Sequence, residues 1–152
     1  MEKVAIIILT FNSGKYLHET IKSCKNQTYK NIDIIIVDDC STDGTIDYLK
    51  SLSDINVFYR SENLGISKNI NFAVSKTNSR YLVFLGHDDL LAPTHVEKMV
   101  EHIETDSDDI ALVHCNSIKI DAKGYELGYI FKNDNQIKKT NKPLFYLAIN
   151  NF

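Results

Sequence analysis

The sequence lacks several features that mark large protein classes. It has two prolines and six glycines in 152 residues, which excludes collagen-like and proline-rich disordered chains. Its longest apolar run, Val4–Leu9, is far shorter than the ~20 residues of a membrane-spanning helix. The run starts directly after Met1–Lys3 and has no small-residue cleavage site, so it is typical of a strand rather than a signal peptide.

The charge balance and the cysteines exclude further classes. Lysine and arginine together number 17 against 20 aspartates and glutamates, a net charge of -3, which argues against electrostatic binding of nucleic acid or an anionic membrane. The three cysteines form no C-x-x-C pair, as expected for free thiols in a reducing cytoplasm. No G-x-G-x-x-G follows the first apolar run, so a Rossmann dehydrogenase is disfavoured.

The remaining composition, 43% hydrophobic and 24% charged, is typical of one globular domain. Strand and helix patterns alternate along the first part of the chain. We expect strands at 4–9, 32–37, 56–59 and 80–85, and helices at 15–26, 45–52, 66–76 and 93–104. This alternation predicts the α/β fold class, with a mostly parallel, Rossmann-like sheet flanked by helices.

After the last of these helices the pattern changes. Residues 110–120 alternate in hydrophobicity, and a turn is expected at 122–124, so a long strand entering a C-terminal hairpin is predicted. We expect residues 133–142 to form a polar loop and residues 144–152 an apolar helix.

Polar side chains follow each predicted strand. In a parallel sheet these positions meet at one edge, where ligands bind. Two acidic pairs are among them, Asp38–Asp39 and Asp88–Asp89. Carboxylates that share a cleft repel one another unless a cation or hydrogen-bond donors compensate them. A few hard oxygen ligands favour Mg²⁺ or Mn²⁺ bridging the phosphates of a substrate.

Four segments, in order, resemble the family 2 inverting glycosyltransferases of the GT-A fold. They are I-I-L-T-F-N at 7–12, V-D-D-C-S-T-D-G-T at 37–45, N-L-G-I-S-K at 63–68 and F-L-G-H-D-D-L-L-A-P at 84–93. The second matches the family pattern V-D-D-x-S-x-D-G-T, and the fourth resembles the strand that carries the D-x-D metal motif. The resemblance covers roughly residues 3–120.

The resemblance implies a role for each matching residue. Thr10 and Asn12 would line the nucleotide pocket, and Asp38 or Asp39 would accept a hydrogen bond from the base. Asn63 and Gly65 would shape the loop over the nucleotide, and Lys68 would reach a phosphate. Asp88, with Asp89 beside it, would bind the metal, Mg²⁺ or Mn²⁺. The nucleotide-binding set is therefore Thr10, Asn12, Asp38, Asp39, Asn63, Gly65, Lys68 and Asp88.

Two positions depart from the family pattern. Gly86 stands where the first aspartate of D-x-D is expected, which predicts a weaker metal site. The family's A-R-N sequence after the glycine loop reads Asn69-Ile70-Asn71, so the arginine and its contact are absent.

The resemblance also implies the reaction and its setting. A sugar would pass from a nucleoside diphosphate sugar, a UDP-sugar by expectation, to an acceptor hydroxyl with inversion and metal assistance. The acceptor would be a glycan or a lipid-linked glycan of bacterial surface polysaccharide. The location would be cytoplasmic, peripheral to the inner membrane face. Residues 1–120 would form the donor-binding core and 121–152 the incomplete start of an acceptor-side region, without the general base. Aromatic residues crowd the last part of the chain, which makes a homodimer a candidate assembly.

Two alternatives stay open at this point. One is a non-catalytic nucleotide-binding or assembly module. The other is a receiver-like signalling domain that binds Mg²⁺ through Asp38 and Asp39, although receivers carry such a pair on their first strand and here it ends the second.

Overall fold

A computed structural model of the protein describes residues 1–105, 110–130 and 138–140. The chain divides into two compact units, one from Met1 to His95 and one from Val96 onward. No helix in the described ranges is both long enough and apolar enough to cross a membrane. All three cysteines are free thiols, as predicted.

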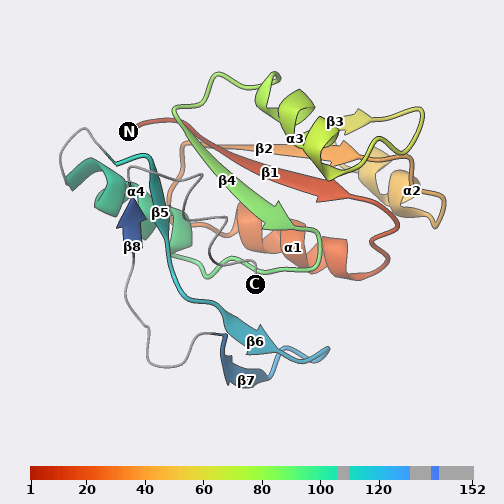
Figure 1. Ribbon diagram of the computed structural model, residues 1–152. Helices are drawn as coiled ribbons and strands as arrows, with labels where there is room; N and C mark the ends of the chain where they lie inside the picture. The colour runs from red at the N-terminus through yellow and green to blue at the C-terminus, as the bar shows by residue number, and fades with distance from the viewer. Residues whose placement is uncertain (106–109, 131–137, 141–152) are drawn as a thin grey trace. The chain divides into compact units, whose positions relative to one another are not determined.

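The first unit is built on a four-stranded parallel sheet with strand order β3-β2-β1-β4. Its strands are β1 (Val4–Thr10), β2 (Ile32–Asp38), β3 (Asn56–Tyr59) and β4 (Tyr81–Gly86). Its connecting helices are α1 (Tyr16–Lys25), α2 (Thr45–Lys50) and α3 (Ile66–Val74). Helices α1 and α3 lie on opposite faces of the sheet (Figure 1). The predicted α/β class and parallel sheet are confirmed.

Continuous apolar sequence explains the centre of this sheet. Strand β1 pairs with β2 on one side and β4 on the other, so it is buried on both faces and needs apolar residues at every position. Side chains from β1 and β2 pack against Ala73 of α3; this cluster consists of Ala5, Ile7, Ile35, Val37 and Ala73. The core thus fixes the strands whose carboxyl ends carry the polar loops.

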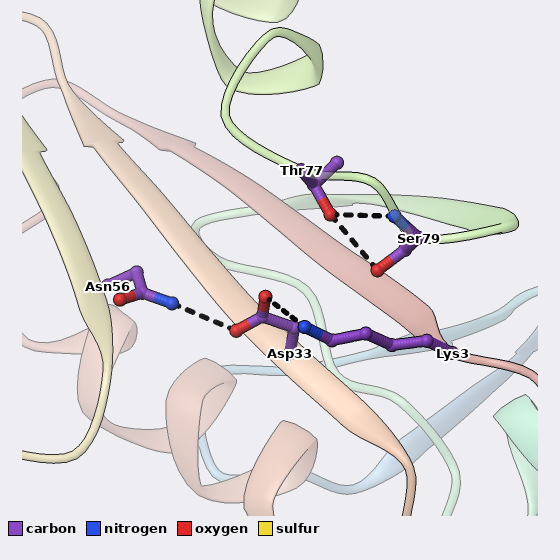
Figure 2. Close-up of polar contacts among 5 residues, drawn as sticks. All are labelled: Lys3, Asp33, Asn56, Thr77 and Ser79. Carbon is purple, nitrogen blue, oxygen red and sulfur yellow. Dashed lines mark hydrogen bonds and ion pairs between the residues drawn. The ribbon is translucent and has the colours of Figure 1, made fainter.

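The amino ends of the strands are joined by polar contacts (Figure 2). The Asp33 carboxylate forms an ion pair with Lys3 at 3.1 Å and accepts a hydrogen bond from Asn56 Nδ2 at 2.9 Å. In the turn that precedes β4, Thr77 Oγ1 accepts a hydrogen bond from the Ser79 backbone N–H at 3.1 Å. These contacts hold the sheet edge opposite the carboxyl ends.

The second unit holds most of α4 (His95–Thr105) and four short strands. Strand β5 (Leu112–His114) pairs with β8 (Lys138–Thr140), and β6 (Ile118–Ile120) pairs with β7 (Glu126–Tyr129), both antiparallel. The β6–β7 pair confirms the predicted hairpin. Asp121 Oδ1 accepts hydrogen bonds from the backbone N–H groups of Lys123 and Tyr125 and so closes its turn.

Two predictions in this region are wrong. Residues 110–120 do not form one strand, because Asn116 and Ser117, residue types that favour turns, separate β5 from β6. The Asn116 side chain accepts a hydrogen bond from the Ser117 backbone N–H at 2.9 Å. Part of the predicted polar loop at 133–142 is strand, since 138–140 form β8. The helix predicted at 144–152 lies outside the described residues.

Candidate functional site

The loops that follow β1 and β2 are locked together. Asn12 donates its backbone N–H to Ser41 Oγ at 2.9 Å, and its Oδ1 accepts the Thr42 backbone N–H at 2.8 Å. Two residues further along the chain, Gly14 donates its backbone N–H to Asp43 Oδ2 at 3.1 Å. Asn12 has a φ of 51°, a left-handed conformation that asparagine tolerates well. Asn12 therefore shapes the edge of the site through its contacts with the second loop.

Asp38, the last residue of β2, forms hydrogen bonds with the loop that follows β2. Its side chain is fully buried, Oδ1 accepts the Ser41 backbone N–H at 3.0 Å, and Oδ2 accepts the Ser41 hydroxyl at 2.5 Å. Both carboxylate oxygens thus have partners inside the loop. The Asp38 carboxylate is therefore bonded within the loop that follows β2.

Asp39 faces the start of α3 instead. Its Oδ1 accepts the Leu64 backbone N–H at 2.8 Å and its Oδ2 accepts the Gly65 backbone N–H at 2.9 Å. The Asn69 side chain also hydrogen-bonds to it, and Arg60 contributes a favourable charge. Burial alone would raise the pKa of Asp39, but these hydrogen bonds and the nearby guanidinium outweigh it, so the pKa is lowered. Asp39 is therefore an ionised carboxylate held at the end of β2.

A pocket of about 570 Å³ opens at this end of the sheet, within the first unit. Figure 1 shows the carboxyl ends of β1, β2 and β4 pointing to the same side. The residues that line the pocket are Ile7, Leu9, Thr10, Phe11, Asp39, Asn63, Gly65, Ile66, Asn69, Ile70, Phe84, Leu85, Gly86, His87 and Asp88. None of these residues is lysine or arginine. The pocket is thus a largely apolar cleft with carboxylates from two strands.

Five of the predicted nucleotide-binding residues line the pocket: Thr10, Asp39, Asn63, Gly65 and Asp88. The other three do not. Asn12 lies in the loop after β1, Asp38 is the last residue of β2, and Lys68 is an exposed residue of α3. The placement separates the members of the acidic pair, since only Asp39 is presented to the pocket.

Glycine at position 86 leaves room for two carboxylates. A Cβ at this position would lie 2.7 Å from Asp89 Oδ2 and 3.2 Å from Asp88 Oδ1. Both oxygens therefore occupy the space of the side chain that is missing at Gly86. In the described part of the chain, no group of three or more His, Cys, Asp or Glu side chains lies close enough to hold a metal ion. Two converging carboxylates remain as a candidate metal site that a phosphate ligand would have to complete.

Two polar atoms in this pocket are buried without a hydrogen-bond partner among the described residues, Asn69 Oδ1 and His87 Nδ1. The sequence pattern does not mark His87 as a site residue, and it marks Asn69 only as a departure from the family's A-R-N sequence. No periodicity or charge pattern marks a buried asparagine as a site residue, so only the packing of α3 identifies it.

Comparison with known proteins places the chain in a family. The model of the family described as "Glycosyl transferase family 2" matches residues 5–151. The chain is 34% identical over 136 residues to an uncharacterized glycosyltransferase of Rickettsia typhi, covering 90% of this chain and 42% of that protein. It is 36% identical over 108 residues to the Escherichia coli UDP-Glc:alpha-D-GlcNAc-diphosphoundecaprenol beta-1,3-glucosyltransferase WfaP, covering 70% of this chain and 43% of WfaP.

A solved structure agrees with the fold. The crystal structure of S. aureus TarS 1–349 in complex with UDP-GlcNAc superposes with a TM-score of 0.65 at 25% identity, covering 71% of this chain and 33% of that one. The chain thus spans less than half the length of these relatives. On the family match and the shared GT-A-like architecture, the chain belongs to glycosyl transferase family 2.

Proposed function

We propose that the chain is the donor-binding part of a glycosyltransferase that transfers a sugar from a nucleoside diphosphate sugar to an acceptor hydroxyl. The observation that carries the proposal is the pocket at the carboxyl ends of the sheet, lined by Asp39, which follows β2, and by Asp88, which follows β4. Its place at the strand ends is where α/β sheets bind nucleotides. Family membership replaces the receiver-domain hypothesis.

A UDP-sugar is the donor we propose, because WfaP is a UDP-Glc glucosyltransferase and TarS forms a complex with UDP-GlcNAc. Thr10, Asn63 and Gly65 would contact the nucleotide, and Asp39 and Asn69 lie on the side proposed for the base. Asn12 and Asp38 would act by holding the two loops in place. Lys68 would meet only a phosphate that extends beyond the lining residues.

The charges of the pocket favour a divalent cation. A nucleoside diphosphate sugar carries two negative charges into a pocket that already presents Asp39 and Asp88 and no cationic side chain in its lining. The negative charges of the ligand and of the two carboxylates would repel one another in this pocket unless a cation neutralised them. Asp88 and Asp89 fit Mg²⁺ or Mn²⁺, because their oxygens converge above Gly86. When bound, such an ion would neutralise charge on the leaving diphosphate.

The acceptor side is also a proposal. We propose a glycan or lipid-linked acceptor, transfer with inversion, and a cytoplasmic location peripheral to the inner membrane face. Residues 1–120 would bind the donor and 121–152 would begin the acceptor-side region. The general base that would deprotonate the acceptor hydroxyl is not among the residues to which we give a role.

Calorimetric titration with UDP, with and without Mn²⁺, tests the proposal. We expect binding that requires Mn²⁺ and is lost in Asp88→Asn. Asp47→Asn is the matched control, because Asp47 is an exposed aspartate of α2 outside the pocket. Absence of binding to any nucleoside diphosphate in Mn²⁺ would refute the proposal, and equal weakening by both variants would refute the place given to Asp88. Binding without transfer in a chain that includes the acceptor side would instead support the non-catalytic module.

A further inference from the structure

Polar side chains of α1 bind the loop that follows β4 at two points. The Thr20 hydroxyl donates to the His87 carbonyl oxygen at 2.9 Å. One turn further along the helix, Ser23 Oγ accepts the Leu91 backbone N–H at 3.1 Å. These two hydrogen bonds enclose residues 88–90. Helix α1 therefore fixes the backbone directly before and directly after the acidic pair of this loop.

The contact continues beyond the end of α1. Gln27 Nε2 donates to the Ala92 carbonyl oxygen at 2.8 Å, and the Thr28 backbone N–H donates to the Pro93 carbonyl oxygen at 2.8 Å. The segment between β4 and α4 thus runs alongside α1 (Figure 1). A row of hydrogen bonds, and not a single contact, determines where this segment lies.

Two of the residues that form these bonds are polar although they are buried. Thr20 is 0% exposed and Gln27 is 1% exposed, whereas the other buried residues of α1 are apolar. A buried hydroxyl or amide destabilises the fold unless it is hydrogen-bonded. Thr20 also has the Tyr16 carbonyl of its own helix within 3.4 Å, but its contact with His87 is the shorter one. The burial of Thr20 thus indicates a specific role toward the loop.

We propose that Thr20 and Ser23 are positioning residues for the metal site, holding the loop so that the Asp88 and Asp89 carboxylates converge above Gly86. This inference rests on the proposed function and adds residues that do not themselves touch the ligand. Two converging carboxylates repel one another when no cation is bound. A loop without these anchors would let them separate. Groups that orient metal ligands typically affect metal affinity by about 10- to 100-fold.

The experiment removes the Thr20 hydroxyl while keeping the size of the side chain. UDP is titrated by calorimetry, at a series of Mn²⁺ concentrations, into the wild-type chain, Thr20→Val, Thr20→Ser and Thr77→Val. Thr77 is the matched control, because its hydroxyl contacts Ser79 in the turn before β4, at the other end of that strand. We expect Thr20→Val to raise the Mn²⁺ concentration that gives half-maximal UDP affinity about tenfold. Thr20→Ser, which retains the hydroxyl, and Thr77→Val should both stay near the wild type.

A second variant and a metal-free measurement accompany this titration. Ser23→Ala changes a half-buried position and should also raise the required Mn²⁺ concentration. Thermal unfolding verifies that each variant is folded at the temperature of the titration. Without Mn²⁺ and UDP, the backbone amides of residues 88–91 should exchange their hydrogens faster in Thr20→Val and Ser23→Ala than in the wild type.

The outcomes separate the positioning role from a purely structural one. Wild-type Mn²⁺ dependence in both Thr20→Val and Ser23→Ala overturns the inference and leaves these hydrogen bonds a role in stability alone. Equal effects of Thr20→Val and Thr20→Ser also overturn it, since packing and not the hydroxyl would then be responsible. If the wild type binds no UDP in Mn²⁺, the proposed function fails and the inference with it. If it binds and the variants behave like the wild type, only the positioning role fails.

Discussion

Substitution of Gly86 by alanine tests whether Asp88 and Asp89 form the metal site. The added Cβ would lie 2.7 Å from Asp89 Oδ2 and 3.2 Å from Asp88 Oδ1, closer than such contacts normally come. Both side chains are exposed, so they can rotate away. Gly86 is not among the glycines with positive φ, so alanine fits its backbone. The free energy of unfolding should change by less than about 1 kcal/mol.

The cost should appear in metal-dependent binding instead. Displacing the groups that orient metal ligands typically lowers affinity by about 10- to 100-fold. We expect Gly86→Ala to weaken UDP binding in Mn²⁺ by a factor in this range. Calorimetry gives the affinity, and thermal unfolding verifies that the fold is intact. Wild-type affinity in Gly86→Ala, with Mn²⁺ present, would refute the reasoning that these carboxylates must converge above position 86.

Three further predictions concern stability and assembly. Ser41→Ala leaves a buried Asp38 oxygen without its hydroxyl donor. It should lower the free energy of unfolding, measured in urea, by about 1–3 kcal/mol. Ser75→Ala, at an exposed serine, should lower it much less, and equal losses in the two variants would contradict the role given to the Ser41–Asp38 hydrogen bond. The lowered pKa of Asp39 means that its stabilising contribution is present above the unfolded-state pKa of about 3.9 and is lost as pH falls through the lower folded-state value. Unfolding measured from pH 6 to 3 should therefore be less pH-dependent in Asp39→Asn than in the wild type, and parallel profiles would argue against this. The β6–β7 hairpin exposes apolar side chains, such as Leu127, and we expect them to form a homodimer interface. Leu127→Lys should therefore weaken the dimer measured by sedimentation velocity. A wild-type chain that is monomeric in this measurement would contradict the prediction.

The sheet could be predicted because its sequence signals are strong and local. Strand β1 is apolar at every position from Val4 to Leu9, and burial on both faces is what such a run requires. The order of polar loops along the chain then predicted a site at the sheet edge where the pocket opens. Helix ends were less well defined, since α3 stops at Val74, two residues before the predicted end.

The different hydrogen-bond partners of neighbouring residues could not be predicted from the sequence. Asp38 and Asp39 are adjacent and chemically identical, yet one bonds within its own loop and the other bonds the start of α3. Which way each side chain points depends on the strand register and on loops that are distant in sequence. The same holds for Asn69, whose burial depends on how α3 packs across β1 and β2.

The hydrogen bonds of Asp39 also affect which orientation of a nucleotide the pocket would favour. The backbone N–H groups of Leu64 and Gly65, at the entry to α3, are of the kind that many nucleotide-binding proteins offer to a phosphate. Here an internal carboxylate already occupies them, so this helix end attracts an anionic ligand far less. The proposed diphosphate would then lie near Asp88, another lining residue, where the proposed cation would neutralise its charge. In the proposed complex, the Asp39 carboxylate would therefore disfavour a nucleotide bound in the reverse orientation, with its phosphates at the start of α3.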